Sequence, residues 1–507
     1  MDKNQRNQAQ GSASIRATSE LTARAVVINR DELVGVIQRH NPWWTGRPAS
    51  VPPFRRIAYY ACRRYLDDPQ LRRAVLLSGP RRVGKTTLLQ QIANAVVEEG
   101  RDPKSVCYLS LDHPVLSHVP VTKLLEVYHE NVWPEGEPVL LLLDEIQYSE
   151  QWDLYLKQLV DHWPAYRIAA TGSASLEHRQ KVAESGVGRW VTTLVPPLSF
   201  YEYLHLREEA PDGLPDDLRP EDIFSMESRE LFLLGGRFRP IMPSFGRYLL
   251  LGGFPEPALR DDLAFCHRML RDDVIDGVLK RDMVVLFNLR SVQNLENLFV
   301  YLCIHSGGVF SPTNCANALE STKTTVGNHL EALEQANLVH LLPPFRRTGK
   351  KALKVPPKVY LVDAALRNAV LLKGEEVLSD PDEMGCIVET CVLRHLLSRY
   401  HADTPEVSHW RERRGDREVD FVVRTPKYTI PVEVKYCASA RAVNGSGLAE
   451  FCQSEKAEHA YWVTQREQDF GLVEVEGSDA KVLRIPAHIF CYLLGQAERL
   501  LWTEERV

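Results

Sequence analysis

Residues 79–86 read Gly-Pro-Arg-Arg-Val-Gly-Lys-Thr, a glycine-rich turn that ends on a lysine and a hydroxyl residue. The apolar run 74–77 precedes it and a helical pattern follows it, which is the context this motif requires. Its two glycines let successive backbone amides point at phosphate oxygens, and the next helix adds its positive amino-terminal end. A plain glycine turn is the alternative, but this spacing arises by chance only about once in a hundred such chains.

The motif therefore predicts a nucleotide site with defined roles. We expect Lys85 to contact the β- and γ-phosphates and Thr86 to ligate magnesium. The residues predicted to cradle the nucleotide are Gly79, Pro80, Arg81, Arg82, Val83, Gly84, Lys85, Thr86 and Thr87.

An acidic pair supplies the other half of this predicted site. Five apolar residues, 139–143, are typical of a buried strand, and Asp144-Glu145 follow directly. The aspartate is placed to hold the magnesium shell, and the glutamate to orient or deprotonate a water molecule. Glu145 thus favours hydrolysis over phosphoryl transfer to a metabolite. The guanine signature Asn-Lys-x-Asp is missing from the sequence, so we predict ATP and not GTP.

Alternating apolar and helical stretches between residues 74 and 204 predict a parallel sheet covered on both faces. Ser173 follows the strand predicted at 166–171 and is our candidate for sensing the γ-phosphate; a helix cap is the alternative. Arg189 is a candidate finger or sensor arginine, with a surface salt bridge as the alternative. The predicted strands span 74–77, 105–109, 139–143 and 166–171.

Composition bounds the class of protein. A chain of 507 residues, 44% apolar and 25% charged, predicts a multi-domain enzyme of about three domains. A net charge of -6 argues against a globally basic nucleic-acid binder. The 10 cysteines form no Cys-x-x-Cys pair, which predicts reduced thiols. There is no run of ~18 apolar residues and no signal-peptide core, so we expect a cytoplasmic protein without membrane contact.

The predicted fold class is α/β, with five segments. Residues 1–28 are expected to be a flexible tail. A P-loop ATPase domain with a parallel sheet should span 29–205, including a packing loop at Asn41–Gly46. A helical lid or linker should follow at 206–290, then a winged-helix module at 291–357. An α/β restriction-endonuclease-like domain should occupy 358–507.

The winged-helix prediction rests on three helical segments followed by an apolar and a basic stretch. The third helix, predicted at Thr324–Gln335, carries apolar and polar residues at helical spacing. Val326, Leu330 and Leu333 should share one face, with Lys323, Asn328 and His329 elsewhere.

A second site is predicted near the end of the chain. Strand-like runs at 417–423 and 428–435 flank the turn-prone Thr425-Pro426-Lys427, which predicts a hairpin. Asp420 and Glu433 are equidistant from its centre and should lie opposite each other, roughly 5 Å apart. Magnesium or manganese between these two carboxylates would offset their repulsion and activate water. Lys435 shares the face of Glu433 and would stabilise developing charge.

Glu389, on a predicted helix, is a candidate third carboxylate for this metal; a solvated glutamate is the alternative. For the hairpin itself, the alternative is an ion-pair ladder. Glu418 would then face Lys435, and Arg417 or Arg413 would neutralise Asp420.

Taken together, residues 70–470 resemble a large bacterial and archaeal family of AAA-type ATPases with a C-terminal domain of unknown function similar to restriction-endonuclease-like folds. The order of the motifs carries this resemblance, which implies an ATPase core, a winged-helix connector and a PD-(D/E)XK nuclease-like end. Besides the two nucleotide motifs, they are Thr171-Gly172-Ser173, Gly188-Arg189, Pro197-Leu198-Ser199-Phe200, Gly252-Gly253-Phe254-Pro255-Glu256, Lys358 to Asp363, Val419-Asp420-Phe421 and Val432 to Lys435.

A basic run from Arg346 to Lys354 follows the third predicted helix where a wing would lie, and its charges suit DNA phosphates. A solvated hairpin is the alternative. We therefore carry two hypotheses: an ATP-hydrolysing enzyme whose C-terminal domain cleaves or grips DNA, and a regulatory ATPase switch that binds a partner or forms a homo-oligomer without cleaving.

Overall fold

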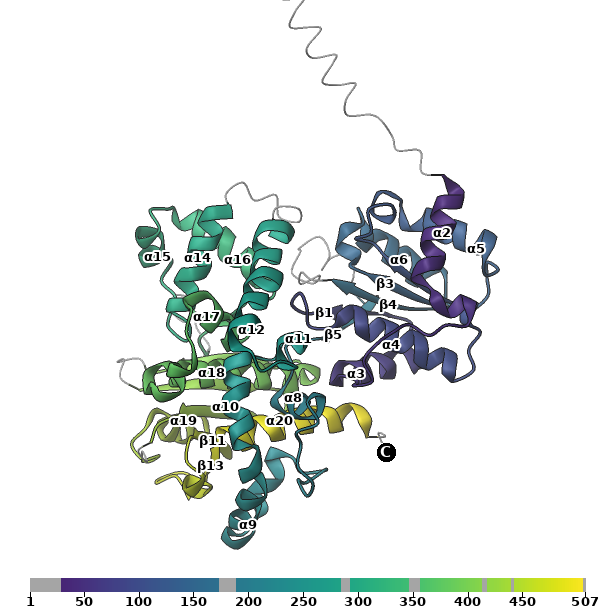
Figure 1. Ribbon diagram of the computed structural model, residues 1–507. Helices are drawn as coiled ribbons and strands as arrows, with labels where there is room; N and C mark the ends of the chain where they lie inside the picture. Colours follow the sequence, from purple (N-terminus) through teal and green to yellow (C-terminus); the bar gives the residue numbers. More distant parts are fainter. Residues whose placement is uncertain are drawn as a thin grey trace, which may run out of the picture.

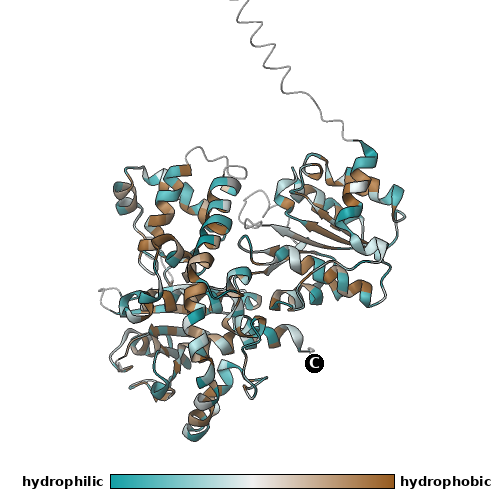
Figure 2. Cartoon of the chain, viewed as in Figure 1, coloured by the Kyte–Doolittle hydropathy of each residue, from teal (hydrophilic) through white to brown (hydrophobic). Residues whose placement is uncertain are grey.

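A computed structural model describes residues 29–172, 188–283, 292–345, 356–412, 417–438 and 442–504 (Figure 1). The predictions for the tail 1–28 and the basic run 346–354 lie outside these residues. Three regions follow one another along the chain: an α/β domain, a helical middle and a second α/β domain. Figure 2 shows apolar positions concentrated on the strands and on the helix sides that face them.

The first domain is built on a five-stranded sheet in the order β2-β3-β4-β1-β5, with every pair parallel. The four predicted strands are confirmed to within one residue at each end. The edge strand β5 was missed because its sequence, Trp-Val-Thr-Thr-Leu, is half polar and only partly buried. The strands are β1 (Ala74–Ser78), β2 (Val106–Ser110), β3 (Val139–Asp144), β4 (Tyr166–Gly172) and β5 (Trp190–Leu194).

Helices cover both faces of this sheet because its strands are buried on both. Val75 and Leu77 share one core with two of the helices, whereas Ala74 and Leu76 share another core with the other three. The first pair is α3 (Ile57–Asp67) and α4 (Lys85–Glu98), and the other three are α2 (Arg30–His40), α5 (Val121–Asn131) and α6 (Trp152–His162).

The entry loop packs against the sheet edge, as predicted. Trp43 and Trp44 each donate a ring N–H to the carbonyl of Val106, at 2.9 and 2.8 Å. The Asn41 amide donates to the Tyr108 carbonyl at 2.8 Å and accepts from the Tyr108 N–H at 2.7 Å. Side chains thus satisfy backbone groups that the edge strand β2 would otherwise leave unpaired.

The first half of the segment predicted as a lid or linker lies against the C-terminal domain. Arg239 pairs with Glu467 at 2.8 Å, and the Phe224 and His459 rings lie 4.2 Å apart. This half of the segment therefore packs on the C-terminal domain. The helices that follow β5 are α8 (Phe200–Leu206), η5 (Pro220–Ser225), α9 (Ser228–Phe238), η6 (Arg239–Ile241), α10 (Met242–Leu251), α11 (Pro255–Ala258), α12 (Leu263–Met269) and the π-helix η7 (Leu270–Asp282).

Three helices and an antiparallel strand pair follow, in the order expected for a winged helix. Val326, Leu330 and Leu333 are buried as predicted, but so is His329. Strand β7 pairs with β6, so the boundary predicted at residue 358 splits this pair and belongs further along the chain. The elements are α14 (Val292–Ile304), α15 (Pro312–Ala318), α16 (Lys323–Gln335), β6 (Val339–Leu342) and β7 (Lys358–Leu361), and a further helix, α17 (Ala364–Leu371), follows them.

The C-terminal domain has a six-stranded mixed sheet in the order β12-β13-β11-β10-β9-β8. Helices α18 and α20 pack together on one face and α19 on the other (Figure 1). Its elements are η9 (Glu375–Ser379), α18 (Pro381–Tyr400), β8 (Glu406–Arg411), β9 (Glu418–Arg424), β10 (Thr429–Lys435), α19 (Gly447–Glu455), β11 (His459–Thr464), β12 (Gly471–Glu474), β13 (Lys481–Pro486) and α20 (Ala487–Thr503).

Candidate nucleotide site and C-terminal carboxylate site

The glycine-rich turn joins β1 to α4 at the carboxyl edge of the first sheet. The Lys85 ammonium donates to the carbonyls of Gly79 and Pro80 at 2.8 and 2.7 Å. Gly84 has a φ of 92°, in the left-handed region that favours glycine. Gly79 is needed for a second reason: a Cβ there would lie 2.0 Å from the Val195 carbonyl oxygen. The turn is therefore held close to β5 as well as being shaped for phosphate.

The acidic pair lies beside this turn. Strands β1 and β3 flank β4 and run parallel to it, so their carboxyl ends lie at the same edge of the sheet. The Thr86 hydroxyl donates to Asp144 Oδ2 at 2.7 Å, and the Tyr108 hydroxyl donates to the same oxygen at 2.7 Å. Thr171, at the end of β4, donates to Asp144 Oδ1 at 2.5 Å and accepts from the Glu145 N–H at 2.9 Å. Burial raises the pKa of Asp144, against these hydrogen bonds.

Two hydroxyls at this site, Tyr108 and Thr171, were not among the predicted site residues. The sequence signal for Thr171 was its position near the carboxyl end of β4, where parallel sheets present ligand groups. Tyr108 lies in the middle of β2, and only its long side chain brings the hydroxyl to this edge. Ser173 lies outside the described residues, so its predicted role stays a prediction. Glu145 adopts a left-handed φ of 54°, and its carboxylate accepts a hydrogen bond from the Gln147 amide.

Arg189 lies away from this edge. It directly precedes β5, whose first residue pairs with Ala74 at the opposite end of the parallel sheet from the glycine-rich turn. Its guanidinium contacts Asp161 at 3.0 Å. The geometry does not support Arg189 as a sensor of the nucleotide bound by its own chain, and the surface ion-pair alternative describes its contact here.

The C-terminal hairpin has the predicted register. Val432 pairs with Phe421 and Thr429 with Arg424, which aligns Glu433 with Asp420. The Asp420 N–H donates to Glu433 Oε2 at 3.3 Å, and Asp420 Oδ2 accepts from the Val434 N–H at 3.0 Å. On its other side, the β9 ladder shifts register at Asp420, an irregularity of the kind that re-aims a side chain.

Two lysines supply the positive charge expected between these carboxylates. Lys435 pairs with Glu433 and lies 3.9 Å from Asp420 Oδ2. Lys358, on β7, lies 3.3 Å from Asp420 Oδ1 and 3.7 Å from Glu418. Lys358 was missed because it is 62 residues away in sequence from Asp420, and only β7 docking brings the two together.

The alternative of an ion-pair ladder named the wrong partners for Asp420, which lies near Lys358 and Lys435. Arg417 pairs with Glu450 at 3.0 Å and not with Asp420, and Arg413 lies outside the described residues. Glu389, on α18, joins the cluster and accepts a hydrogen bond from the Tyr360 hydroxyl at 3.0 Å.

Electrostatics at this cluster favour protonation or a bound cation. Burial and the Asp420 charge raise the pKa of Glu433 to about 8, against the opposing charge of Lys435. The same two causes raise the pKa of Glu389 to about 8. The predicted metal ligands Asp420, Glu433 and Glu389 do not form a set whose ligand atoms all lie within 4.8 Å of one another. Among the described residues, Cys391, His395 and Cys491 do form such a set.

A buried polar chain links the glycine-rich turn to helix α18 of the C-terminal domain. Arg56 donates to the Val83 carbonyl of the glycine-rich turn at 2.9 Å and forms a bidentate pair with Glu202 at 3.0 Å. Arg394, on α18, lies 3.9 Å from Glu202 and donates to the Pro197 carbonyl. Burial alone would raise the pKa of Glu202, but the two guanidiniums outweigh it and lower the pKa to about 2.

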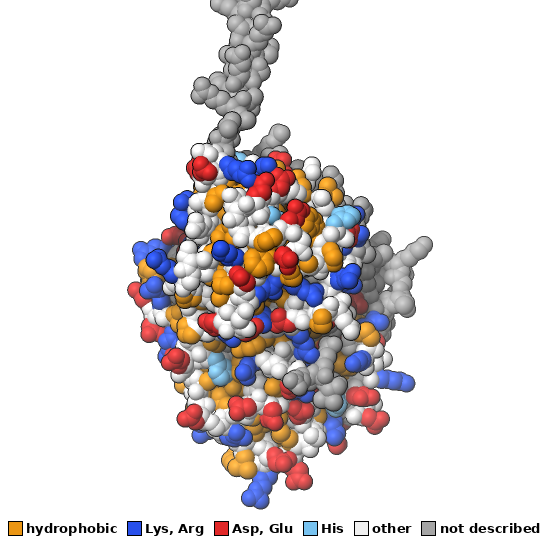
Figure 3. Space-filling model, turned by 90° about the vertical axis from the view of Figure 1, so that its right-hand side faces the viewer, with side chains coloured by type: hydrophobic (Ala, Val, Ile, Leu, Met, Phe, Trp, Pro, Cys, Tyr) orange, Lys and Arg blue, Asp and Glu red, His pale blue; other side chains and the backbone are white. Residues whose placement is uncertain are grey.

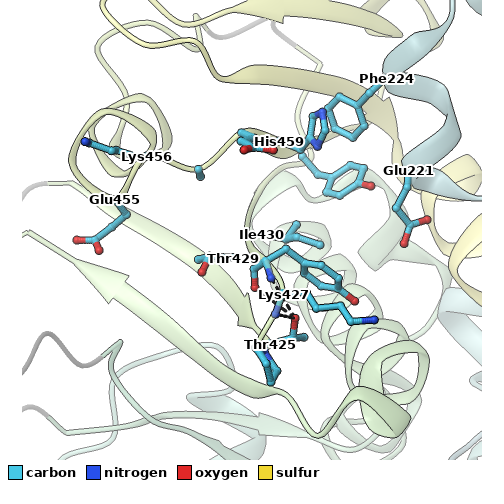
Figure 4. A pocket seen from close by; sticks show the side chains of 14 residues that line it. Glu221, Phe224, Thr425, Lys427, Thr429, Ile430, Glu455, Lys456 and His459 are labelled. Atoms are coloured by element: carbon cyan, nitrogen blue, oxygen red, sulfur yellow. Dashed lines mark hydrogen bonds between the residues drawn. The ribbon is translucent and has the colours of Figure 1, made fainter.

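A cavity of about 390 Å³ lies at the tip of the hairpin formed by β9 and β10 (Figure 4). Its walls include the turn Thr425–Tyr428, Phe224 from η5 and His459 from β11. Lys427 and Glu221 flank one side in this view. Asp420 and Glu433 do not line it, so this cavity is separate from the carboxylate site.

Comparisons with known proteins agree with the class that the fold and the nucleotide site define. Residues 71–204 match a family model described as an AAA domain. Residues 242–376 and 384–487 match two domains of unknown function, DUF8612 and DUF4143. The chain therefore carries an AAA-type P-loop ATPase domain followed by these two domains.

Relatives occur in archaea and bacteria. An uncharacterized protein of Methanocaldococcus jannaschii is 27% identical over 62% of this chain and 66% of its own length. An uncharacterized protein of Haemophilus influenzae is 24% identical over 71% and 82%. One from Mycobacterium tuberculosis is 27% identical over 76% of each chain. The match thus spans about two thirds of the length of the archaeal relative.

Among solved structures, partial likeness is found to the replication initiator DnaA bound to AMPPCP and single-stranded DNA. It has a TM-score of 0.24 at 20% identity and covers 56% of this chain and 89% of that chain. The Saccharomyces cerevisiae Hsp104:casein complex gives a TM-score of 0.28 at 13% identity, over 89% and 73%. Scores this low carry no functional argument. In the part of the chain that the structure describes, no helix is long and apolar enough to cross a membrane.

Proposed function

We propose that this protein hydrolyses ATP with magnesium at the site formed by the glycine-rich turn and β3. The carrying observation is the 2.7 Å contact between the Thr86 hydroxyl and Asp144, since these two oxygen donors suit a magnesium shell. Bound there, magnesium would neutralise charge on the phosphates. Lys85 would release its two carbonyl partners to bind the β- and γ-phosphates, and Glu145 would orient or deprotonate the attacking water.

Substitution tests this proposal directly. Lys85→Ala should abolish magnesium-dependent phosphate release from ATP, whereas Lys123→Ala, an exposed lysine paired with Glu126, should not. Hydrolysis that survives Lys85→Ala would refute the assignment.

For the C-terminal site, the proposal is a metal-dependent action on a nucleic-acid backbone. The support is the cluster of Asp420, Glu433 and Lys435, with Glu389 beside it. Carboxylate oxygens fit magnesium or manganese, and such an ion would compete with Lys358 and Lys435 for them. One test incubates the protein with duplex and single-stranded DNA, ATP and either metal. Scission should disappear in Glu433→Ala and persist in Glu458→Ala, which alters an exposed glutamate on the hairpin cavity.

A second candidate, a regulatory ATPase switch, is favoured by the burial of the same cluster. Asp420 and Glu433 are each 2% exposed, and Lys358 is 4% exposed. The face shown in Figure 3 intersperses basic and acidic side chains, with no broad basic surface for DNA among its described residues. This candidate predicts nucleotide-dependent assembly without strand scission. Sizing Glu145→Gln with and without ATP tests it, because the trapped ATP state should change the oligomer or its partner binding.

A further inference from the structure

One helix of the middle region reaches the nucleotide site. Helix η7, which continues α12, makes two ion pairs with the glycine-rich turn: Arg82 with Asp273 and Arg81 with Asp282, each at 3.2 Å. Between them, a Cβ at Gly277 would lie 3.3 Å from the Arg81 side chain, so glycine lets Arg81 lie close to the helix. Both arginines of the phosphate cradle are thus engaged by one helix from outside the ATPase domain.

The π-helical form of η7 makes this double contact possible. Asp273 and Asp282 are nine residues apart, which is about 2.5 turns of an α-helix and would place them on opposite faces. With the i→i+5 hydrogen bonding of a π-helix, nine residues make about two turns and the side chains align. Long π-helical stretches are rare and are associated with functional sites.

Asp282 lies within the catalytic neighbourhood. Its side chain is 4% exposed, and its Oδ1 accepts a hydrogen bond from the hydroxyl of Tyr148, just beyond the acidic pair, at 3.1 Å. Burial lowers the pKa of Lys85, and the carboxylates of Glu145, Asp144 and Asp282 oppose that effect. The helix therefore adds a third carboxylate near the lysine that should bind phosphate.

We propose that Asp282 competes with the γ-phosphate of ATP for Arg81, so that nucleotide binding must release the end of η7. This inference rests on the proposed ATPase function and names its regulation. A phosphate brings more negative charge than a carboxylate and can accept two hydrogen bonds from Arg81, whereas the contact with Asp282 runs from Arg81 Nη1 to Oδ1. Until it binds, the Asp282 carboxylate repels the incoming phosphate and holds Arg81 on the helix.

The same helix carries the signal away from the site. Arg271, at its start, donates to the Ala369 carbonyl of α17 at 2.8 Å. Val274, Val278 and Leu279 are buried in one core with α14 and α16. Release of Asp282 therefore changes how the helical middle sits on the ATPase domain. ATP binding is coupled in this way to the region that supplies Lys358 to the C-terminal site.

The test uses the full chain and a fluorescent ATP analogue with magnesium. Asp282→Asn removes the charge at constant size and should tighten binding about tenfold, equivalent to about 1.4 kcal/mol, with the gain shrinking at high salt. Asp282→Glu should restore weak binding. Asp276→Asn, on the same helix but paired with Lys280 at 2.7 Å, is the matched control and should change nothing. If Asp282→Asn fails to fold, Asp273→Asn should give a smaller gain.

The outcomes separate this inference from the ATPase proposal. If the natural chain binds the analogue and Asp282→Asn binds it equally or more weakly, the competition is refuted and the ATPase proposal stands. If neither binds it, both fail. A gain in Asp282→Asn that Lys85→Ala abolishes supports both, because the analogue then occupies the predicted cradle.

Discussion

Glu202 provides the sharpest test of how the domains are held together. Its carboxylate is 3% exposed and lies between the guanidiniums of Arg56 and Arg394. The fall of its pKa from 4.5 to about 2 corresponds to a stabilisation of about 3 kcal/mol at neutral pH. Glu202→Gln should cost at least that much, because it leaves two buried cations without their counter-charge.

The direction in which this stabilisation changes with pH follows from the lowered pKa of Glu202. The stabilisation is complete above about pH 4.5 and is lost as the pH falls towards 2, so the difference between natural protein and variant should halve by about pH 3. Urea unfolding midpoints of both proteins, taken from pH 7 downward, measure this difference in stability. Glu99→Gln is the control, since Glu99 makes the same bidentate pair with Arg63 but is 58% exposed, and it should cost under about 1 kcal/mol. Equal losses in both variants at pH 7 would refute the reasoning.

Three further predictions concern single side chains. Gly79→Ala should abolish nucleotide binding in a titration, because its methyl would lie 2.0 Å from the Val195 carbonyl; unchanged binding would show that the turn can move. Glu433→Gln should gain stability over the natural chain as pH rises from 4.5 to about 8, by on the order of 4 kcal/mol, because the natural carboxyl must ionise while buried; a flat difference in urea midpoints contradicts this. Trp43→Phe should cost about 1–2 kcal/mol in urea unfolding, since the Val106 carbonyl keeps its bond from Trp44; a larger loss would place more of the stability in this loop.

Local patterns predicted much of this protein because they report local physics. A strand buried on both faces is a continuous apolar run, so β1 to β4 could be located to within a residue, whereas the half-polar β5 could not. A hairpin register follows from its turn, which is why Asp420 was correctly set against Glu433. Burial on a helix was harder to predict, because neighbouring elements also cover His329, which was placed off the apolar face of its helix.

The sequence by itself therefore determined the nucleotide cradle, the acidic pair and the facing carboxylates, since each depends on residues close together in the chain. Only the tertiary structure decided which distant charges meet them. Lys358 neutralises Asp420, Asp282 engages Arg81, and Arg394 reaches Glu202 because helices and strands dock. Docking is set by the shape of whole surfaces, and no short stretch of sequence encodes it.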